Sequence, residues 1–541
     1  MRDGIHLHSV LYLPQGNWPI STLLLRTPFG SGSIDYTEWG AEFVKSGYAV
    51  VLQDVRGRNN SGGKCNPYVQ EINDGYDTHE WIGNQNWCDG NIGTFGISYS
   101  GFTQILPAHL NSRFVKALVP VGNQSNNYGH LRYNGVLQLE NVINWIWWGN
   151  KNTQHVNSNL IDWDKLYKKL PLINAIEDIC HRPYYKKIII NEKYNKFWEE
   201  TDISKQYNKV KAPAFFITGW YDNLLNETFK NFCGWVNKSR SKLVKSKTKL
   251  LVGPWYHYNF GMDTKFGDIS FGPKAKINLV NEQIRWFDKR LKNIDNGIDL
   301  EPPIKLFIMG ANSWRDEYEW PLKRTKYERL FFHSHGHANS LNGDGYLSKT
   351  LPGYEGQDTY RYDPEDPVPT TGGQGQYQDT SGPKDRSKIE LRNDILVYSS
   401  EVLCDECEIT GSVEINLYAA SSAKDTDFTA TLVDVYPDGR AINISEGIVR
   451  AKFRNSYSKP TLIKPNKIYL YKILIWETSN LFKKNHRIRI EISSSNFPRF
   501  DRNLNSGRVS SIDDQPKICH QQIFHNKNHP SNVILPVIPV S

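Results

Sequence analysis

The sequence has none of the long apolar runs found in membrane proteins. No run approaches the roughly 18 apolar residues that a membrane-spanning helix needs. Hydrophobic residues still make up 39% of the 541 residues and aromatic residues 13%, which excludes a disordered chain. We therefore expect a soluble globular protein of two or three domains, with no membrane partner.

Cysteine is scarce and irregularly placed. The seven cysteines are odd in number, so they do not form a disulfide framework. Cys404 and Cys407 form one C-x-x-C pair, but zinc needs four ligands, and neither a second pair nor a nearby histidine completes a set. We expect these thiols to be incidental, and we expect no metal and no cofactor.

The chain also lacks an amino-terminal secretory signal and a nucleic-acid-binding motif. Its first seven residues are polar, which favours a cytoplasmic location. The net charge of +8 arises from 65 basic and 57 acidic residues spread along the chain. The densest basic run, residues 238–249, is interrupted by hydroxyl and apolar residues. We expect a solvated loop that leads into a strand there, and no nucleic-acid partner.

What the sequence does contain is a candidate nucleophile elbow. Residues 96–101 read Gly-Ile-Ser-Tyr-Ser-Gly, with Ser100 where the second glycine of the G-x-S-x-G pattern usually stands. Small residues on both sides of the serine allow a strained turn between strand and helix, which would hold the Ser98 hydroxyl clear of the backbone. An expected strand precedes the turn and an expected helix follows it. Alone, so short a motif is explained equally well by an ordinary loop.

Two further residues complete a candidate catalytic triad in the order nucleophile, acid, base. Asp222 follows the apolar run 213–219 and His257 follows the run 249–254, so each lies beyond the carboxyl end of an expected parallel strand. A serine needs a neighbouring imidazole to take its proton, and the imidazole needs a carboxylate to hold the correct tautomer. The sequence therefore predicts a triad of Ser98, Asp222 and His257.

The pattern of elements predicts a doubly wound α/β fold that is interrupted and then followed by an all-β region. Strands and helices alternate up to about residue 120, aromatic-rich helical segments follow, and the alternation resumes near residue 208. Beyond a Pro- and Gly-containing linker at 295–303, short alternating strands separated by turn residues continue to the end. The expected domains are an α/β domain at 1–120 and 208–295, a helical cap at 121–207, and a β domain at 302–541. A Gly- and Gln-rich segment, 370–386, is expected to be a surface loop.

Aromatic residues gather around the candidate triad and in the cap. We expect a substrate pocket lined by the two residues before the acid, one residue near the base and three in the cap: Trp220, Tyr221, Trp255, Trp145, Trp147 and Trp148. The alternative is that these side chains only fill the protein core.

With these features in place, the chain resembles nearly end to end the hydrolase family that contains cocaine esterase, the α-amino-acid ester hydrolases, glutaryl cephalosporin acylases and X-prolyl dipeptidyl peptidases. The motifs that carry the resemblance are Arg26-Thr-Pro28, Asp54-Val-Arg-Gly57, Asp74-Gly-Tyr-Asp77, the elbow, Gly219-Trp-Tyr-Asp222, Gly253-Pro-Trp-Tyr-His257, Trp314-Arg315, Asp366-Pro-Val-Pro-Thr370 and Ser493-Ser-Ser-Asn-Phe-Pro-Arg-Phe-Asp-Arg502. The resemblance implies an α/β-hydrolase domain with an inserted helical cap, followed by an all-β jelly-roll domain. It also implies hydrolysis of an acyl ester or amide by Ser98, Asp222 and His257.

Two departures from the family pattern narrow this interpretation. The α-amino-acid ester hydrolases place extra carboxylates directly after the catalytic aspartate to hold the substrate ammonium, whereas here Asp222 is followed by Asn-Leu-Leu. A buried cation without a counter-charge is costly, so α-amino substrates are not expected to be preferred. The second departure is Phe29, because the family usually has a tyrosine there whose hydroxyl supplies half of the oxyanion hole.

The leading hypothesis is a serine esterase or acylase that acts on a small ester or amide, with the Tyr99 backbone N–H as an oxyanion donor. X-prolyl dipeptidyl peptidase or β-lactam side-chain acylase activity is the alternative. A third hypothesis, of another class, is a catalytically silent binding protein that uses its jelly roll; the missing tyrosine hydroxyl favours it and the intact triad disfavours it. The acyl group, the leaving group and homo-oligomerisation stay open.

Overall fold

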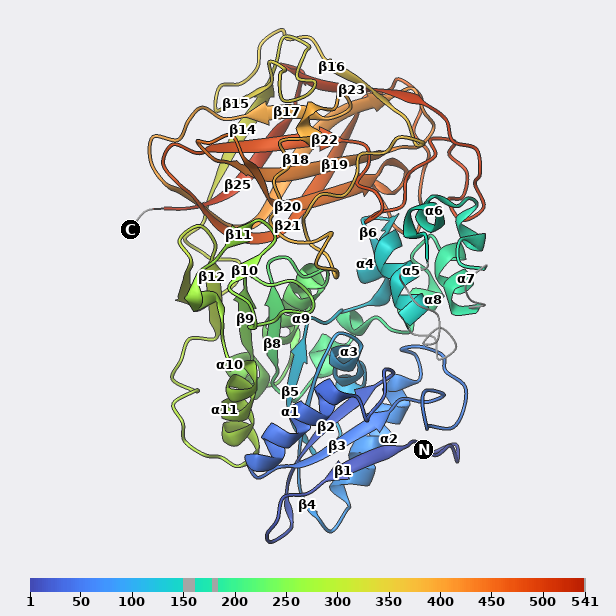
Figure 1. Ribbon diagram of the computed structural model, residues 1–541, viewed down its shortest axis with the longest axis vertical. Coiled ribbons are helices and arrows are strands. Elements are labelled where there is room, and N and C mark those ends of the chain that lie inside the picture. Colours follow the sequence, from blue (N-terminus) through green and yellow to red (C-terminus); the bar gives the residue numbers. More distant parts are fainter. Residues whose placement is uncertain (149–160, 178–182, 540–541) are drawn as a thin grey trace.

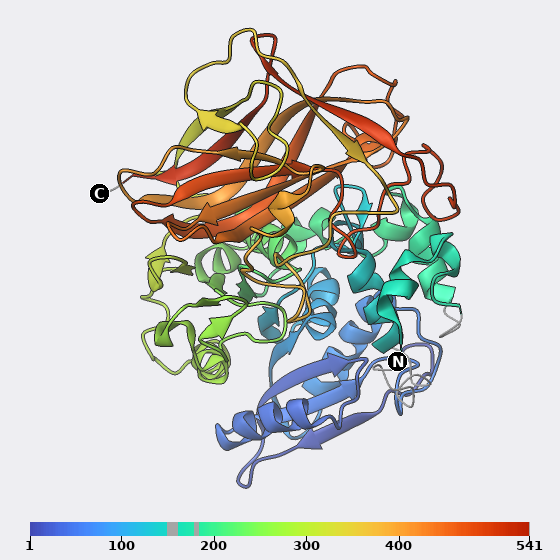
Figure 2. The same cartoon turned by 45° about the horizontal axis from the view of Figure 1, so that its top comes forward.

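The computed structural model describes residues 1–148, 161–177 and 183–539. Two large sheets lie one above the other along the long axis of the molecule, with a cluster of helices beside the junction (Figures 1 and 2). None of the helices in these ranges combines the length and the apolar character that crossing a membrane would require.

The first sheet has nine strands in the order β1-β3-β2-β4-β5-β8-β9-β12-β13. Its strands are β1 (Ser9–Tyr12), β2 (Ile20–Thr27), β3 (Ala49–Asp54), β4 (Cys88–Ile97), β5 (Val115–Val121), β8 (Phe215–Gly219), β9 (Lys249–Gly253), β12 (Ile304–Ile308) and β13 (Ser313–Glu317). All pairs from β3 to β12 are parallel, and only the two edge pairs are antiparallel. The carboxyl ends of the central strands therefore meet along one edge, where ligands bind in folds of this kind.

Helices cover both faces of this sheet, which is why its central strands are apolar throughout instead of alternating. They are α1 (Ile34–Lys45) and α11 (Leu279–Leu291) on one face, and α2 (Glu71–Gly83), α3 (Tyr99–Ile105) and α9 (Leu225–Lys238) on the other. Phe43 of α1 and Trp286 of α11 are buried in one hydrophobic cluster. Phe102 of α3 and Trp235 of α9 are buried in another. The short helix α10 (Lys242–Lys247) lies within the basic run 238–249, where a plain loop was expected.

The inserted cap lies between β5 and β8. It comprises α4 (Asn127–Leu131), β6 (Arg132–Tyr133), β7 (Val136–Leu137), α5 (Leu139–Trp148), α6 (Trp163–Lys168), α7 (Pro183–Ile190) and α8 (Lys196–Glu199). It has its own core, which includes Ile143 and Trp198, and Phe497 of the β domain packs into the same cluster. The backbone N–H of Glu140 also donates to the Pro498 carbonyl at 3.0 Å. The cap is therefore attached to the β domain as well as to the first sheet.

The second sheet forms the carboxyl-terminal domain, and all but one of its named strand pairs are antiparallel. Its strands are β14 (Lys326–His333), β15 (Tyr346–Ser348), β16 (Asp358–Tyr362), β17 (Leu396–Ser399), β18 (Cys407–Ser421), β19 (Asp427–Val435), β20 (Ala441–Arg450), β21 (Tyr469–Phe482), β22 (Arg487–Ser493), β23 (Cys519–Asn526), β24 (His529–Pro530) and β25 (Asn532–Ile538). The expected fold class, an α/β-hydrolase domain with a helical cap followed by an all-β domain, is confirmed.

The first sheet extends past the expected start of the β domain. The β domain was expected to begin at residue 302, but β12 pairs in parallel with β9 and carries β13 at the edge of the first sheet. The apolar edge of β9 needs a hydrogen-bonding partner, and the chain that follows the linker supplies it. Residues 304–317 thus complete the first sheet instead of starting the second.

Candidate functional site

Ser98 lies at the turn from β4 into α3, in a backbone conformation that is rare for residues other than glycine. Its φ is 60° and its ψ is −121°. Gly96 precedes the turn with a φ of 140°, and a Cβ there would lie 2.6 Å from the Ser100 Cβ, so only glycine fits. The Ser98 N–H donates to the carbonyl oxygens of Val121 at 2.9 Å and Gly122 at 3.1 Å. These bonds hold the strained turn that the elbow motif predicts.

Asp222 and His257 form a buried pair at the ends of β8 and β9. The two residues are joined by a 2.8 Å hydrogen bond between His257 Nδ1 and Asp222 Oδ1, and neither is more than 1% exposed. The Thr218 hydroxyl donates to the other carboxylate oxygen at 2.9 Å, and the Leu224 N–H donates to Oδ1 at 3.0 Å. Three donors therefore fix the carboxylate, which in turn fixes the tautomer with a proton on Nδ1 and leaves Nε2 as the basic nitrogen.

Gly122 is the point at which the elbow meets this pair. Its carbonyl accepts from the Ser98 N–H, and a Cβ on Gly122 would lie 2.8 Å from Asp222 Oδ2 and 3.4 Å from His257 Cε1. Its φ of +46° is also left-handed. The structure thus brings the three residues of the candidate triad together at the carboxyl ends of β4, β8 and β9.

Tyr99 and Phe29, which the sequence predicts on either side of an oxyanion hole, lie next to each other. Tyr99 is the first residue of α3, so its N–H is one of those without an acceptor inside the helix. The Phe29 ring packs edge-on against the Tyr99 ring, with centroids 6.5 Å apart. The Phe29 backbone N–H already donates to Thr27 Oγ1 at 3.1 Å. Phe29 therefore offers the hole neither a hydroxyl nor a free N–H.

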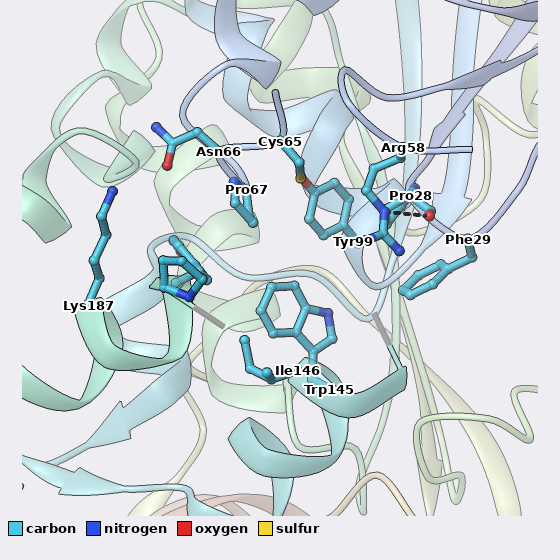
Figure 3. Close-up of a pocket in the computed structure, with 12 residues that line it drawn as sticks. Pro28, Phe29, Arg58, Cys65, Asn66, Pro67, Tyr99, Trp145, Ile146 and Lys187 are labelled. Atoms are coloured by element: carbon cyan, nitrogen blue, oxygen red, sulfur yellow. Dashed lines mark hydrogen bonds between the residues drawn. The ribbon is translucent and has the colours of Figure 1, made fainter. Parts of the chain in front are cut away.

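A cavity of about 190 Å³ opens beside these two residues (Figure 3). It is lined by apolar and aromatic side chains with a few polar ones: Pro28, Phe29, Arg58, Cys65, Asn66, Pro67, Tyr99, Trp145, Ile146, Pro183, Tyr184 and Lys187. Trp145 stacks on Tyr68 and Tyr99 at ring distances of 5.5 and 6.5 Å. The cap thus forms one wall of the cavity and the elbow another.

Three of the aromatic residues that were expected to line a pocket do not line this one. Trp220, Tyr221 and Trp255 are at most 1% exposed, and each uses its polar atom in the core. The Trp220 indole donates to the Phe307 carbonyl, the Tyr221 hydroxyl to the Asn443 carbonyl, and the Trp255 indole to the Ala275 carbonyl. Their expected role was wrong because these side chains point from the catalytic loops into the sheet and the β domain.

Of the cap tryptophans that were expected in the pocket, one lines the cavity and another lies in the core. Trp145 lines the cavity. Trp147 is 3% exposed and packs edge-to-face against Trp163, with ring centroids 5.6 Å apart, so it belongs to the cap core. The Trp148 side chain lies outside the part of the chain that the structure describes.

The Gly- and Gln-rich segment 370–386 was expected to be a surface loop, and this was wrong. Most of it is buried between the β domain and the catalytic loops. The Gln374 side chain donates to the Trp220 carbonyl at 3.0 Å, and the Gln376 side chain donates to the Tyr258 hydroxyl. Its glycines allow the backbone to approach closely: a Cβ on Gly375 would lie 2.1 Å from Ser381 Oγ. Low side-chain bulk was the available signal for this packing.

His130 of α4 was not anticipated as a neighbour of the site. Burial, with the charge of His257 as a second cause, lowers the pKa of His130 to about 3, so His130 is neutral near pH 7. The Asn141 amide lies 3.2 Å from His130 Nε2, and His130 Nδ1 has no partner among the described residues. Nothing in the local sequence pattern distinguishes this histidine from a packing residue.

No cluster of three or more metal-ligating side chains suited to hold a metal ion occurs among residues 1–148, 161–177 and 183–539. The site consists of a strained serine, a buried imidazole–carboxylate pair and an aromatic-walled cavity. This combination, at the carboxyl edge of an α/β-hydrolase sheet, is that of the serine hydrolases.

Comparison with known proteins gives the family. The profile of the X-Pro dipeptidyl-peptidase family, S15, matches residues 3–259, and that of the X-Pro dipeptidyl-peptidase carboxyl-terminal non-catalytic domain matches residues 296–534. Cocaine esterase from Rhodococcus sp. (strain MB1 Bresler) is 36% identical, over 99% of this chain and 97% of its own. The chain therefore belongs to the X-Pro dipeptidyl-peptidase and cocaine esterase family of serine hydrolases.

Solved structures show the same fold over the whole chain. An aminopeptidase from the marine sediment archaeon Thaumarchaeota archaeon superposes with a TM-score of 0.86 at 22% identity, covering 100% of this chain and 95% of the other. An α-amino acid ester hydrolase superposes with a TM-score of 0.84 at 22% identity, covering 99% and 95%.

Proposed function

We propose that the protein is a serine esterase that cleaves carboxylic esters of small molecules through an acyl-enzyme intermediate. Ser98 is the nucleophile, His257 the general base and then general acid, and Asp222 the residue that orients the imidazole. The observation that carries the proposal is the buried 2.8 Å bond between His257 and Asp222 beyond the carboxyl ends of β8 and β9, at the same edge of the sheet as the strained Ser98 turn after β4.

The proposed reaction uses these three residues in two steps. His257 Nε2 takes the Ser98 proton as the oxygen attacks the ester carbonyl, and the Tyr99 N–H donates to the negative oxygen that develops. When the ester C–O bond breaks, the imidazolium gives its proton to the departing alcohol and leaves an acyl ester on Ser98. A water molecule, deprotonated by the same imidazole, then attacks the acyl carbon, and the acid leaves as Ser98 regains its proton.

The alternatives that need an ammonium anchor have less support. No carboxylate is among the described residues that line the cavity, and Asn223, Leu224 and Leu225, which follow Asp222, are buried and uncharged. A free α-amine bound there would lack a counter-charge. These observations disfavour X-prolyl dipeptidyl peptidase activity, although it is the activity named for several relatives.

Labelling with a fluorophosphonate probe tests the proposal. Wild-type protein should be labelled stoichiometrically and Ser98→Ala should not, since the probe reacts only with an activated serine. A folded wild type that stays unlabelled would instead favour the silent binding protein. Turnover of 4-nitrophenyl esters beside the matching anilides then separates esterase from amidase activity.

A further inference from the structure

The charged side chains among the described residues that line the cavity beside Tyr99 are all positive. Its described lining contains two cationic side chains, Arg58 and Lys187, and no carboxylate. Neither cation forms an ion pair with another side chain of the described residues, whereas neighbouring Arg56 is paired with Asp3 and Asp74. An unpaired cation at a partly desolvated wall favours an anion as its partner, because its charge is less screened there than in bulk water.

Arg58 is the better placed of the two. Its Nε donates to the Pro28 carbonyl at 3.2 Å, which fixes the guanidinium while the two Nη groups have no acceptor in the described chain. Figure 3 shows the guanidinium between the side chains of Tyr99 and Phe29, on the side of the cavity opposite Lys187. The guanidinium edge that stays available presents two parallel N–H groups, the arrangement that matches a carboxylate.

The remaining walls suit a flat apolar body. Trp145, Tyr99 and Phe29 supply aromatic surface, and Pro67 and Ile146 supply aliphatic surface. A cavity of about 190 Å³ has room for a single substituted ring and little more. The cavity therefore combines a ring-sized apolar space with one fixed cationic fork.

We infer that this cavity selects esters whose acyl group is an aromatic or similarly compact apolar body that carries a carboxylate, with Arg58 as the residue that binds the carboxylate. The inference rests on the proposed esterase function and names its substrate class. It requires no second catalytic site, since the ester carbonyl of such a substrate lies at Ser98 while its anionic end reaches Arg58. Lys187 lies at the exposed opposite edge and adds a weaker, screened attraction.

Two matched esters test the inference. The 4-nitrophenyl esters of 4-carboxybenzoic acid and 4-methylbenzoic acid have the same leaving group and similar size, and they differ mainly in the charge at the far end of the ring. Wild-type kcat/KM should be at least about tenfold higher for the carboxylated ester, the size of a charge-assisted hydrogen bond. Raising the ionic strength should reduce this ratio.

Variants of Arg58 test whether this residue causes the preference for the carboxylated ester. Arg58→Gln should reduce the ratio to about one, Arg58→Lys should keep part of it, and Arg58→Glu should reverse it. Lys186→Gln is the matched control, because Lys186 lies next to Lys187 in α7 but is paired with Glu177 and is not part of the cavity wall. It should leave the ratio as in the wild type.

Ligand binding to the Ser98→Ala variant tests the inference without any turnover. Calorimetry with monomethyl terephthalate and methyl 4-methylbenzoate should show tighter binding of the anion, and Arg58→Gln in the same background should remove the difference. A wild-type ratio near or below one, or a ratio that survives Arg58→Gln, would overturn the inference while esterase activity stands. Absence of labelling and turnover together with Arg58-dependent binding would instead overturn the esterase proposal and leave the anion site.

Discussion

The Gly375 N–H donates to the Tyr221 carbonyl at 2.9 Å, although the two residues are in different domains. The bond lies directly before Asp222, which forms an isolated parallel bridge with Gly375. The loop that presents the candidate catalytic acid is thus paired with the 370–386 segment of the β domain instead of being supported only by its own sheet.

Substitution of Gly375 by alanine should therefore impair catalysis. The new Cβ would lie 2.1 Å from Ser381 Oγ, 3.1 Å from Ser381 Cβ and 3.0 Å from Arg499 Nη2, so the packing of the segment around Ser381 and Arg499 must shift. We expect kcat on 4-nitrophenyl esters to fall at least several-fold and the melting temperature to decrease. Gly353→Ala is the control, because no atom lies within 4 Å of a Cβ there, and equal behaviour of the two variants would contradict the role of the segment.

Loss of any triad side chain should remove nearly all turnover. Ser98→Ala and His257→Ala should each abolish measurable ester hydrolysis, and the double variant should be no worse than either, because triad members act as a unit. Asp222→Asn should cost roughly 10⁴ in kcat, since an amide stabilises the wrong imidazole tautomer. Retention of more than a tenth of the wild-type kcat by a folded Asp222→Asn protein would show that another carboxylate is the acid.

Phe29→Tyr should increase the rate on unactivated esters. The Phe29 ring has no donor and its N–H is bonded to Thr27 Oγ1, so the oxyanion has one fewer donor than the family pattern provides. Removal of a single donor elsewhere costs about 10² to 10³ in kcat. We expect kcat to rise at least several-fold with little change in KM when the hydroxyl is restored. An unchanged or lower kcat in a folded variant would mean that another group already supplies the bond.

An aromatic acyl group should be preferred to a small one. Burying a phenyl-sized group against Trp145 and Tyr99 should contribute roughly 2 kcal/mol to selection at about 25 cal/mol per Å². Phenylacetyl esters should therefore have a higher kcat/KM than acetyl esters of the same alcohol, and Trp145→Ala should reduce the difference. Trp147→Ala is the comparison, because Trp147 is not part of the cavity wall. Equal kcat/KM for the two acyl groups in the wild type would refute the preference.

A buried histidine in the β domain should make stability depend on pH. Burial alone would lower the pKa of His525, but its hydrogen bond and charge interaction with Asp358, together with Glu355, raise it overall. Burial alone would raise the pKa of Asp358, but its hydrogen bond with His525 and others lower it. The His525 contribution is complete below its unfolded pKa of about 6.5 and is lost as pH rises through the folded pKa. The Asp358 contribution is complete above about pH 4 and is lost as pH falls through its folded pKa.

The stabilisation by this pair should therefore be largest between about pH 4 and 6.5. The difference in the free energy of unfolding between wild type and His525→Asn, measured by urea denaturation, should be larger at pH 6 than at pH 9. His520→Asn is the control on the same strand, because His520 is exposed. A difference that does not change with pH would show that His525 does not titrate in this range.

The local sequence pattern predicted the main strands of the first sheet and proposed the candidate triad. Buried parallel strands produce apolar runs, so β8 (Phe215–Gly219) and β9 (Lys249–Gly253) fall inside the runs that predicted them. Asp222 and His257 could be placed because residues that follow such strands meet at one edge of the sheet.

Side-chain direction and distant contacts could not be predicted in this way. Trp220 and Tyr221 adjoin Asp222 in sequence but point into the core, because the tight turn after β8 directs only Asp222 towards His257. The cavity wall combines residues from six separate segments, and no periodicity connects them. Burial of the 370–386 segment depends on partners such as Trp220, which lies 154 residues from Gln374.

Because the 370–386 segment pairs with the Asp222 loop, the candidate site is completed only late in the synthesis of the chain. While the chain emerges from the ribosome, Ser98, Asp222 and His257 are all translated before any residue of the β domain. The Asp222 loop nevertheless lacks its partner until the chain has passed Gly375, and the side chain of Arg499, which donates to the Gly372 carbonyl, joins only later. A nascent chain that stops at the linker would therefore carry every side chain of the candidate triad and still lack the segment that pairs with the Asp222 loop.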